Sequence, residues 1–142
     1  MSSNFKDSSE RHLLDAEHLL QDPQDQRLAN ADHLFGISAE CSLKAVMVGL
    51  GMETTDDGSP QDRAYKVHID KLWAAFQSFA QGRMAARYLE PLDLGNPFAT
   101  WSVDQRYWAR SSFAKDDVLS HKAAADQCRT SLLRLTLDGV SR

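Results

Sequence analysis

The feature that most constrains this chain is the spacing of its apolar residues, which recur every three or four positions along most of its 142 residues. This period places them on one face of an α-helix, and no useful stretch shows the apolar–polar alternation of a half-buried β-strand. Proline and glycine separate the periodic stretches, because both are common where helices end. We therefore expect four principal helices, at residues 8–21, 26–48, 64–88 and 112–137.

These helices predict an all-α fold, an antiparallel up-and-down bundle of four to five helices. A chain of this length has the usual size of one domain, so we expect a single helical domain over residues 1–142. The first helix should begin at Ser8 or Ser9, whose hydroxyl groups can cap it.

A long connection, residues 91–111, precedes the last helix and shows no period. Irregular segments of this length inside a compact domain are often functional. The aromatic residues of this segment are Phe98, Trp101, Tyr107 and Trp108. They predict that the segment packs on the bundle, where it either closes over a pocket or only seals the core.

The composition excludes several classes of protein. With 42% hydrophobic and 25% charged residues, the chain is neither disordered nor collagen-like. The longest nearly unbroken apolar stretch, 45–52, is too short to cross a bilayer, so no membrane association is expected. The net charge of −4 is untypical of a protein that coats nucleic acid without specificity, although a local basic patch is compatible with it.

Cys41 and Cys128 match no metal-ligand spacing, and we expect buried, reduced thiols in a cytoplasmic protein.

Five histidines raise the question of a metal site. Di-iron bundles use a Glu-x-x-His motif on each of two helices, together with two further carboxylates. This chain offers only Asp15-x-x-His18, with no second copy. We therefore expect no metal and no other cofactor, while a metal-dependent bundle enzyme with histidines from several helices stays an alternative.

A polar line runs along the second expected helix. His33, Glu40 and Lys44 are separated by seven and four residues and so share one face. Glu40 four residues before Lys44 is the favourable order for an ion pair. The pair is embedded among small and apolar residues, where burial would be costly without a wider network. It has either a structural or a ligand-holding role.

Arginine and aromatic residues gather around the long connection. They are Arg83, Arg87, Arg106, Tyr107, Trp108 and Arg110. Guanidinium groups bind phosphate with two parallel hydrogen bonds, and aromatic rings stack on bases, so these residue types suit a nucleotide or RNA contact. The alternative is that Trp101 and Trp108 cover the core while the arginines pair with Asp93 or Asp104.

A further pair, Arg63 and His68, has the spacing Arg-x-x-x-x-His and contains residue types that can act in catalysis. In a metal-independent ribonuclease such a pair provides a proton donor or acceptor and a clamp for phosphate. We keep Arg63 and His68 as the candidate catalytic residues of that alternative.

Three short motifs resemble one known family. The pattern His33-x6-Glu40-x3-Lys44-Ala looks like the second-helix signature of HEPN (higher eukaryotes and prokaryotes nucleotide-binding) domains. The segment 68–72 resembles the opening of their third helix, and Arg106-Tyr107 resembles the approach to their last helix. The resemblance spans most of residues 10–138. It implies an up-and-down helical bundle, frequent dimerisation, and nucleotide binding or metal-independent RNA cleavage in a bacterial toxin–antitoxin or defence system.

The chain departs from this family at one point. Ribonuclease members carry an Arg-x4–6-His motif at the start of the last helix, but neither Arg106 nor Arg110 is followed by a histidine at that distance, and His121 lies eleven residues after Arg110. The resemblance, with this departure, implies a non-catalytic HEPN-like module that binds a nucleotide, an RNA or a nucleotidyltransferase-type partner protein and forms a homodimer. The expected ligand-binding residues are His33, Glu40, Lys44, His68, Arg106 and Tyr107.

Overall fold

The structure is a computed structural model that describes residues 1–23 and 27–139. Within these residues it is all-helical, as predicted, with one isolated β-bridge between Thr54 and Pro60. The elements are α1 (Phe5–Leu20), α2 (Leu28–Gly49), α3 (Ile69–Gly82), α4 (Ala86–Leu89), the 3-10 helices η1 (Val103–Tyr107) and η2 (Arg110–Ser112), and α5 (Lys115–Leu137).

Helix α2 is the centre of the bundle and packs against α1, α3 and α5. Its apolar residues are buried on several sides, with Phe35, Leu43 and Met47 fully enclosed. A helix covered on most of its faces can still carry polar residues, provided that each finds a partner. This position explains why Glu40 and Lys44, which the sequence places on α2, are both buried.

Helix α1 runs antiparallel to α2. The hydroxyl group of Ser38 in α2 donates a hydrogen bond of 2.7 Å to the carbonyl of Ser9, near the start of α1. Closer still to that start, the ring of Phe5 lies 5.8 Å from the ammonium group of Lys44, near the end of α2. Residues at the start of one helix therefore meet residues at the end of the other.

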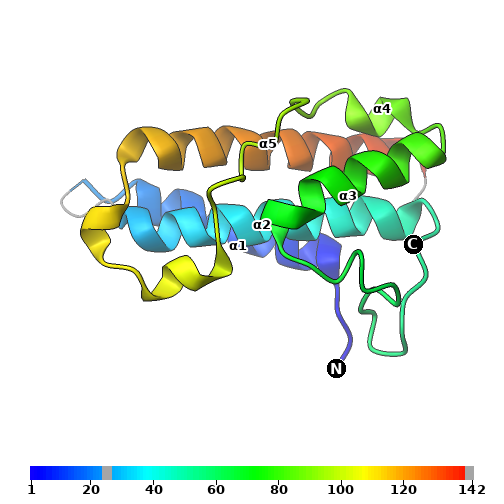
Figure 1. Cartoon of the computed structure of the whole chain (residues 1–142), viewed down its shortest axis with the longest axis horizontal. Coiled ribbons are helices and arrows are strands. Elements are labelled where there is room, and N and C mark those ends of the chain that lie inside the picture. Colours follow the sequence, from blue (N-terminus) through cyan, green and yellow to red (C-terminus); the bar gives the residue numbers. More distant parts are fainter. Residues whose placement is uncertain (24–26, 140–142) are drawn as a thin grey trace.

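Helix α5 runs in the same direction as α2, and α3 shares this general direction (Figure 1). Asp32 and His121, near the starts of α2 and α5, contact each other at 2.6 Å, while Val48 and Leu135, near their ends, line one hollow. The helix directions thus differ from a simple up-and-down order. The reason is that the long connections 50–68 and 90–114 carry the chain back along the bundle before α3 and α5 begin.

Two helices, α1 and α3, differ in their boundaries from the predicted ones. Helix α1 begins at Phe5, because the side chain of Asn4 accepts a hydrogen bond from the backbone N–H of Asp7 and caps the helix, in place of Ser8 or Ser9. Helix α3 is shorter than the predicted 64–88. It ends at Gly82, and Met84 then adopts a left-handed backbone conformation (φ 55°) before α4 begins.

The connection before α5 packs on the bundle with its first half. Phe98 and Trp101 are buried, whereas Tyr107 and Trp108 are 76% and 48% exposed. Ser102 and Gln105 form a capping box at the start of η1, which gives this part of the connection a defined helical turn. The aromatic residues therefore divide into two that seal the core and two that face outward.

Candidate functional site

Glu40 connects two residues that the sequence analysis places in the same site. Its carboxylate accepts a hydrogen bond of 2.9 Å from Lys44 at one oxygen and lies 2.9 Å from Nδ1 of His68 at the other. Lys44 lies one turn further along α2, and His68 caps the start of α3, which packs against α2. Because both oxygens of this buried carboxylate are satisfied, the network offsets part of the cost of burying the charges.

The imidazole of His68 is oriented by this contact. A carboxylate only accepts hydrogen bonds, so Nδ1 of His68 is assigned as the donor and Nε2 as the nitrogen with a free lone pair in the neutral ring. The side chain is 49% exposed, against 11% for Glu40. Glu40 therefore fixes the orientation of His68, and Nε2 of the neutral ring is left to accept a hydrogen bond from a ligand at the exposed edge.

Two further histidines lie near this network, His33 of α2 and His12 of α1. Burial lowers the pKa of His33 below its usual value, and the positive charges of Arg106 and His12 lower it further. Burial also lowers the pKa of His12, with a smaller contribution from Arg11. In the described part of the chain, Nδ1 of each ring is buried and has no hydrogen-bond partner. The surroundings of both rings therefore disfavour additional positive charge.

Arg106 and Tyr107 complete the predicted set. The guanidinium of Arg106 lies 4.9 Å from the centre of the Tyr107 ring, and both side chains are exposed. Arg106 is close enough to His33 for its charge to lower the pKa of that histidine. In the structure, Lys44 and His68 thus both contact Glu40 directly. Arg106 lies near His33 and lowers its pKa, and Tyr107 lies beside Arg106.

The cationic surface continues toward the start of α2. A hollow of about 180 Å3 lies there between Arg27, Asn30, Arg106, Trp108 and Arg110. The first turn of α2 has neither a side-chain cap nor an acidic residue, so its backbone N–H groups add partial positive charge to the same region. This hollow extends the surface around Arg106.

His12 is the member of the site that sequence reasoning missed. It lies on α1, and only the antiparallel packing of α1 on α2 brings it near His33 and Glu40. The sequence around His12 does not predict that this residue lies near His33 and Glu40. Its place could have been inferred only from an antiparallel packing of the first two helices.

Arg63 is exposed, in the turn that precedes His68. No hydrogen bond or ion pair joins it to Glu40, Lys44 or His68 in the structure that is described, so the Arg63–His68 pair stays a prediction. Across residues 1–23 and 27–139, no three His, Cys, Asp or Glu side chains are grouped so as to hold a metal ion.

A second polar network fastens the connection to the bundle. Asp32 of α2 lies 2.6 Å from Nδ1 of His121 on α5 and accepts a hydrogen bond of 2.7 Å from Gln105 of η1. The indole N–H of Trp101 donates to the backbone carbonyl of Asp32. Because Gln105 precedes Arg106, this network also holds Arg106 at the edge of the site.

The two cysteines stand apart from this chemistry. Cys41 and Cys128 are free and buried, as predicted. Burial raises the pKa of the Cys41 thiol to about 12 and raises that of Cys128 as well, so both thiols stay protonated near neutral pH. Neither is suited to act as a nucleophile or a metal ligand.

Comparisons with known proteins identify no family for this chain. Of the helices that the structure describes, none has both the length and the apolar character needed to cross a bilayer. No protein-family model matches the chain, and the searches of curated proteins and of solved structures find no match either.

Proposed function

We propose that this chain is a non-catalytic, HEPN-like helical module that binds a phosphate-bearing ligand, a nucleotide or an RNA. The binding surface is the one around Glu40, with His12, His33, Lys44, His68 and Arg106, and we call it the histidine face. The observation that carries the proposal is a chain of neighbouring polar groups: Lys44 and His68 bind the buried carboxylate of Glu40, His12 lies near that carboxylate, and His33 lies close enough to His12 and Arg106 to feel their charges.

The lowered pKa values of His12 and His33 support an anionic ligand. Burial lowers both pKa values most and nearby cations lower them further, whereas a bound phosphate would favour the protonated rings. Arg106 has the planar fork that binds phosphate oxygens in pairs, and the exposed ring of Tyr107 beside it can stack on a base. Lys44 is buried and paired with Glu40, so it offsets the negative charge of that carboxylate beneath the surface.

The resemblance to HEPN domains adds expectations about the setting. We infer a homodimer in the cytoplasm, working with a nucleotidyltransferase-type partner in a bacterial toxin–antitoxin or defence system. These expectations rest on the motifs at His33, Glu40, Lys44, His68 and Arg106-Tyr107 rather than on the geometry of the site.

Replacing Arg106 by glutamine tests the proposal directly. We expect a nucleotide or a short oligoribonucleotide to raise the melting temperature of the native protein, since a ligand at 100 times its Kd stabilises by about 2.7 kcal/mol. Arg106→Gln should weaken that binding about tenfold or more, because it removes a charged hydrogen bond worth about 1.5–3 kcal/mol. The measurements are thermal shift with a nucleotide and RNA panel, followed by calorimetry on any ligand found.

Arg83→Gln is the matched control, because Arg83 is also exposed but follows the far end of α3 from His68. It should bind like the native protein. Absence of any shift across the panel would contradict ligand binding and leave only the partner-protein form of the proposal. Equal binding by the Arg106 and Arg83 variants would remove Arg106 from the site.

A second candidate function is metal-independent RNA cleavage, favoured by the Glu40–His68 contact, which orients a half-exposed imidazole. General acid–base catalysis by such a group contributes about 10²- to 10⁴-fold, so His68→Gln should reduce cleavage by that factor if the chain is a ribonuclease. Our proposal instead expects no cleavage of single-stranded or structured RNA by the native protein. Cleavage that is lost in His68→Gln and in Arg63→Gln would establish the alternative.

A further inference from the structure

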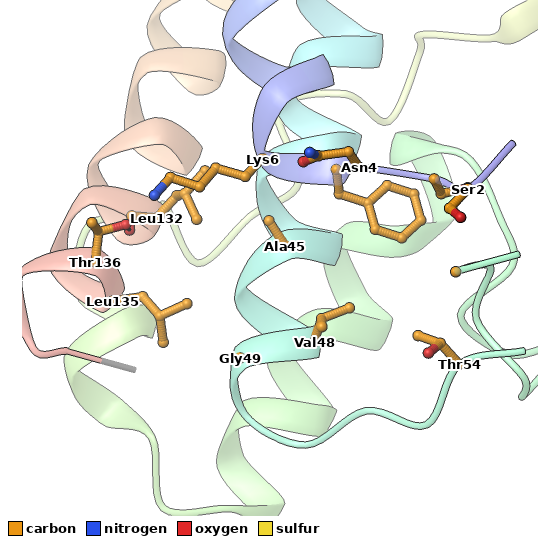
Figure 2. A pocket seen from close by; sticks show the side chains of 13 residues that line it. Ser2, Asn4, Lys6, Ala45, Val48, Gly49, Thr54, Leu132, Leu135 and Thr136 are labelled. Atoms are coloured by element: carbon orange, nitrogen blue, oxygen red, sulfur yellow. The ribbon is translucent and has the colours of Figure 1, made fainter. Parts of the chain in front are cut away.

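A second hollow, of about 490 Å3, lies at the opposite end of α2 from Arg106. It opens where the N-terminal segment, the end of α2 and the end of α5 meet (Figure 2). The hollow is open to solvent on one side, and its volume lies within the 300–1,000 Å3 that is common for sites of small molecules. We call this hollow the end pocket.

The apolar wall of the end pocket is made mainly by two helices. Ala45 and Val48 of α2 and Leu132 and Leu135 of α5 line it (Figure 2). The small side chain of Ala45, and the absence of one at Gly49, leave space that a larger residue at either position would occupy. Phe5 adds an aromatic ring to these aliphatic side chains, and together they form an apolar wall that suits a hydrocarbon chain.

Among the described residues that line the end pocket, Lys6 is the one with a cationic side chain. Lys6 of α1 extends across the mouth of the pocket toward Thr136 of α5 (Figure 2). No ion pair or side-chain hydrogen bond of Lys6 occurs within the described residues, so its ammonium group is available to an anion there. Thr136 already donates its hydroxyl hydrogen to the carbonyl of Leu132 and therefore offers the pocket only an acceptor.

From this combination we propose that the end pocket binds an aliphatic monocarboxylate of medium chain length. The alkyl chain lies against Ala45, Val48, Leu132 and Leu135, and the carboxylate pairs with the ammonium of Lys6. Charge complementarity selects a carboxylate over a neutral or cationic head group. This inference is independent of the histidine face, whose Arg106 borders the start of α2 rather than its end.

The test uses hexanoate, octanoate and decanoate with the full chain, measured by isothermal titration calorimetry below their micelle concentrations. Affinity should rise about fourfold for each added methylene group while the chain still lies within the pocket. Decyltrimethylammonium, with the same alkyl chain and the opposite charge, should bind at least about tenfold more weakly than decanoate.

Two variants locate the site. Lys6→Gln should weaken decanoate binding about fivefold to tenfold, and Ala45→Leu should abolish it by filling the wall. Lys66→Gln, at another exposed lysine, is the control and should bind like the native protein. Since Lys6 is exposed, its replacement leaves the fold intact even if Ala45→Leu disturbs the packing, which circular dichroism reports. Absence of saturable decanoate binding, or equal binding by Lys6→Gln and Lys66→Gln, would overturn the proposal.

Discussion

Asp32→Ala should lower the free energy of unfolding by about 3–5 kcal/mol, because it leaves the buried side chains of His121 and Gln105 without a hydrogen-bond partner, each at a cost of about 1–3 kcal/mol. Asp32 is 3% exposed and His121 is 6% exposed. The carboxylate contacts His121 at 2.6 Å and Gln105 at 2.7 Å, so its removal also orphans a buried amide. Domains of this kind are stable by only about 5–15 kcal/mol, so the loss is a large share of the total.

Urea denaturation followed by circular dichroism measures this effect. Asp126→Ala is the matched control, because Asp126 forms an exposed ion pair with Lys122 one turn before it on α5, and such pairs contribute less than about 1 kcal/mol. In the double variant Asp32→Ala/His121→Ala, the cost should be smaller than the sum of the two single changes, since the residues interact directly. A loss below about 1 kcal/mol for Asp32→Ala would show that the network does not stabilise the fold.

The helices themselves could be predicted because their signal is local. Apolar residues three and four positions apart must share a face, so the number and type of the long helices follow from spacing alone. Boundaries depend on single hydrogen bonds and backbone angles, and these are weaker signals. Asn4 caps α1 although Ser8 and Ser9 were equally suitable residue types, and the left-handed conformation of Met84 separates α3 from α4 without any glycine at that position.

Helix direction could not be read from the sequence. Short loops force neighbouring helices to be antiparallel, but a connection as long as 50–68 or 90–114 permits either direction. Which one is adopted depends on the packing of side chains far apart in the chain. The pairing of Asp32 with His121 is one such contact, and it joins helices whose sequences give no sign of one another.

Part of the candidate site was accessible from sequence for a similar reason. Glu40 and Lys44 lie one helical turn apart, and the structure contains the ion pair that this spacing predicts. The contact between Glu40 and His68 spans two elements, and it was anticipated only through the resemblance of both motifs to one family. His12 has neither a local spacing nor a motif to connect it with the site, which is why only the folded chain reveals it.

The aromatic residues of the connection show how composition predicts packing without predicting which residue packs. Trp101 is enclosed and stacks on His33, with ring centres 5.9 Å apart, whereas Trp108 is about half exposed. The difference follows from the partner surface, because α2 has a glycine at position 36 where the indole of Trp101 lies against it. Nothing in the sequence predicts that the indole of Trp101 packs against this glycine.

Gly36→Ala should therefore be destabilising, although alanine normally favours a helix over glycine by about 1 kcal/mol. A methyl group at position 36 would overlap the indole of Trp101, and the ring would have to move away from α2. Its hydrogen bond to Asp32, 3.1 Å long, would be lost with it. Overpacking of a core costs about 1–3 kcal/mol and the hydrogen bond about 1 kcal/mol more, so we expect a net loss of about 2 kcal/mol.

Gly82→Ala is the control for this change, because Gly82 is also helical and a methyl group there would meet no other atom within 4 Å. It should leave the free energy of unfolding unchanged or raise it slightly, through helix propensity alone. Tryptophan fluorescence should shift to longer wavelength in the Gly36 variant and stay unchanged in the Gly82 variant, since only the first displaces a buried indole. If both variants were equally stable, Trp101 would have to be accommodated without close contact to α2, and the account of how the connection is fastened to the bundle would be wrong.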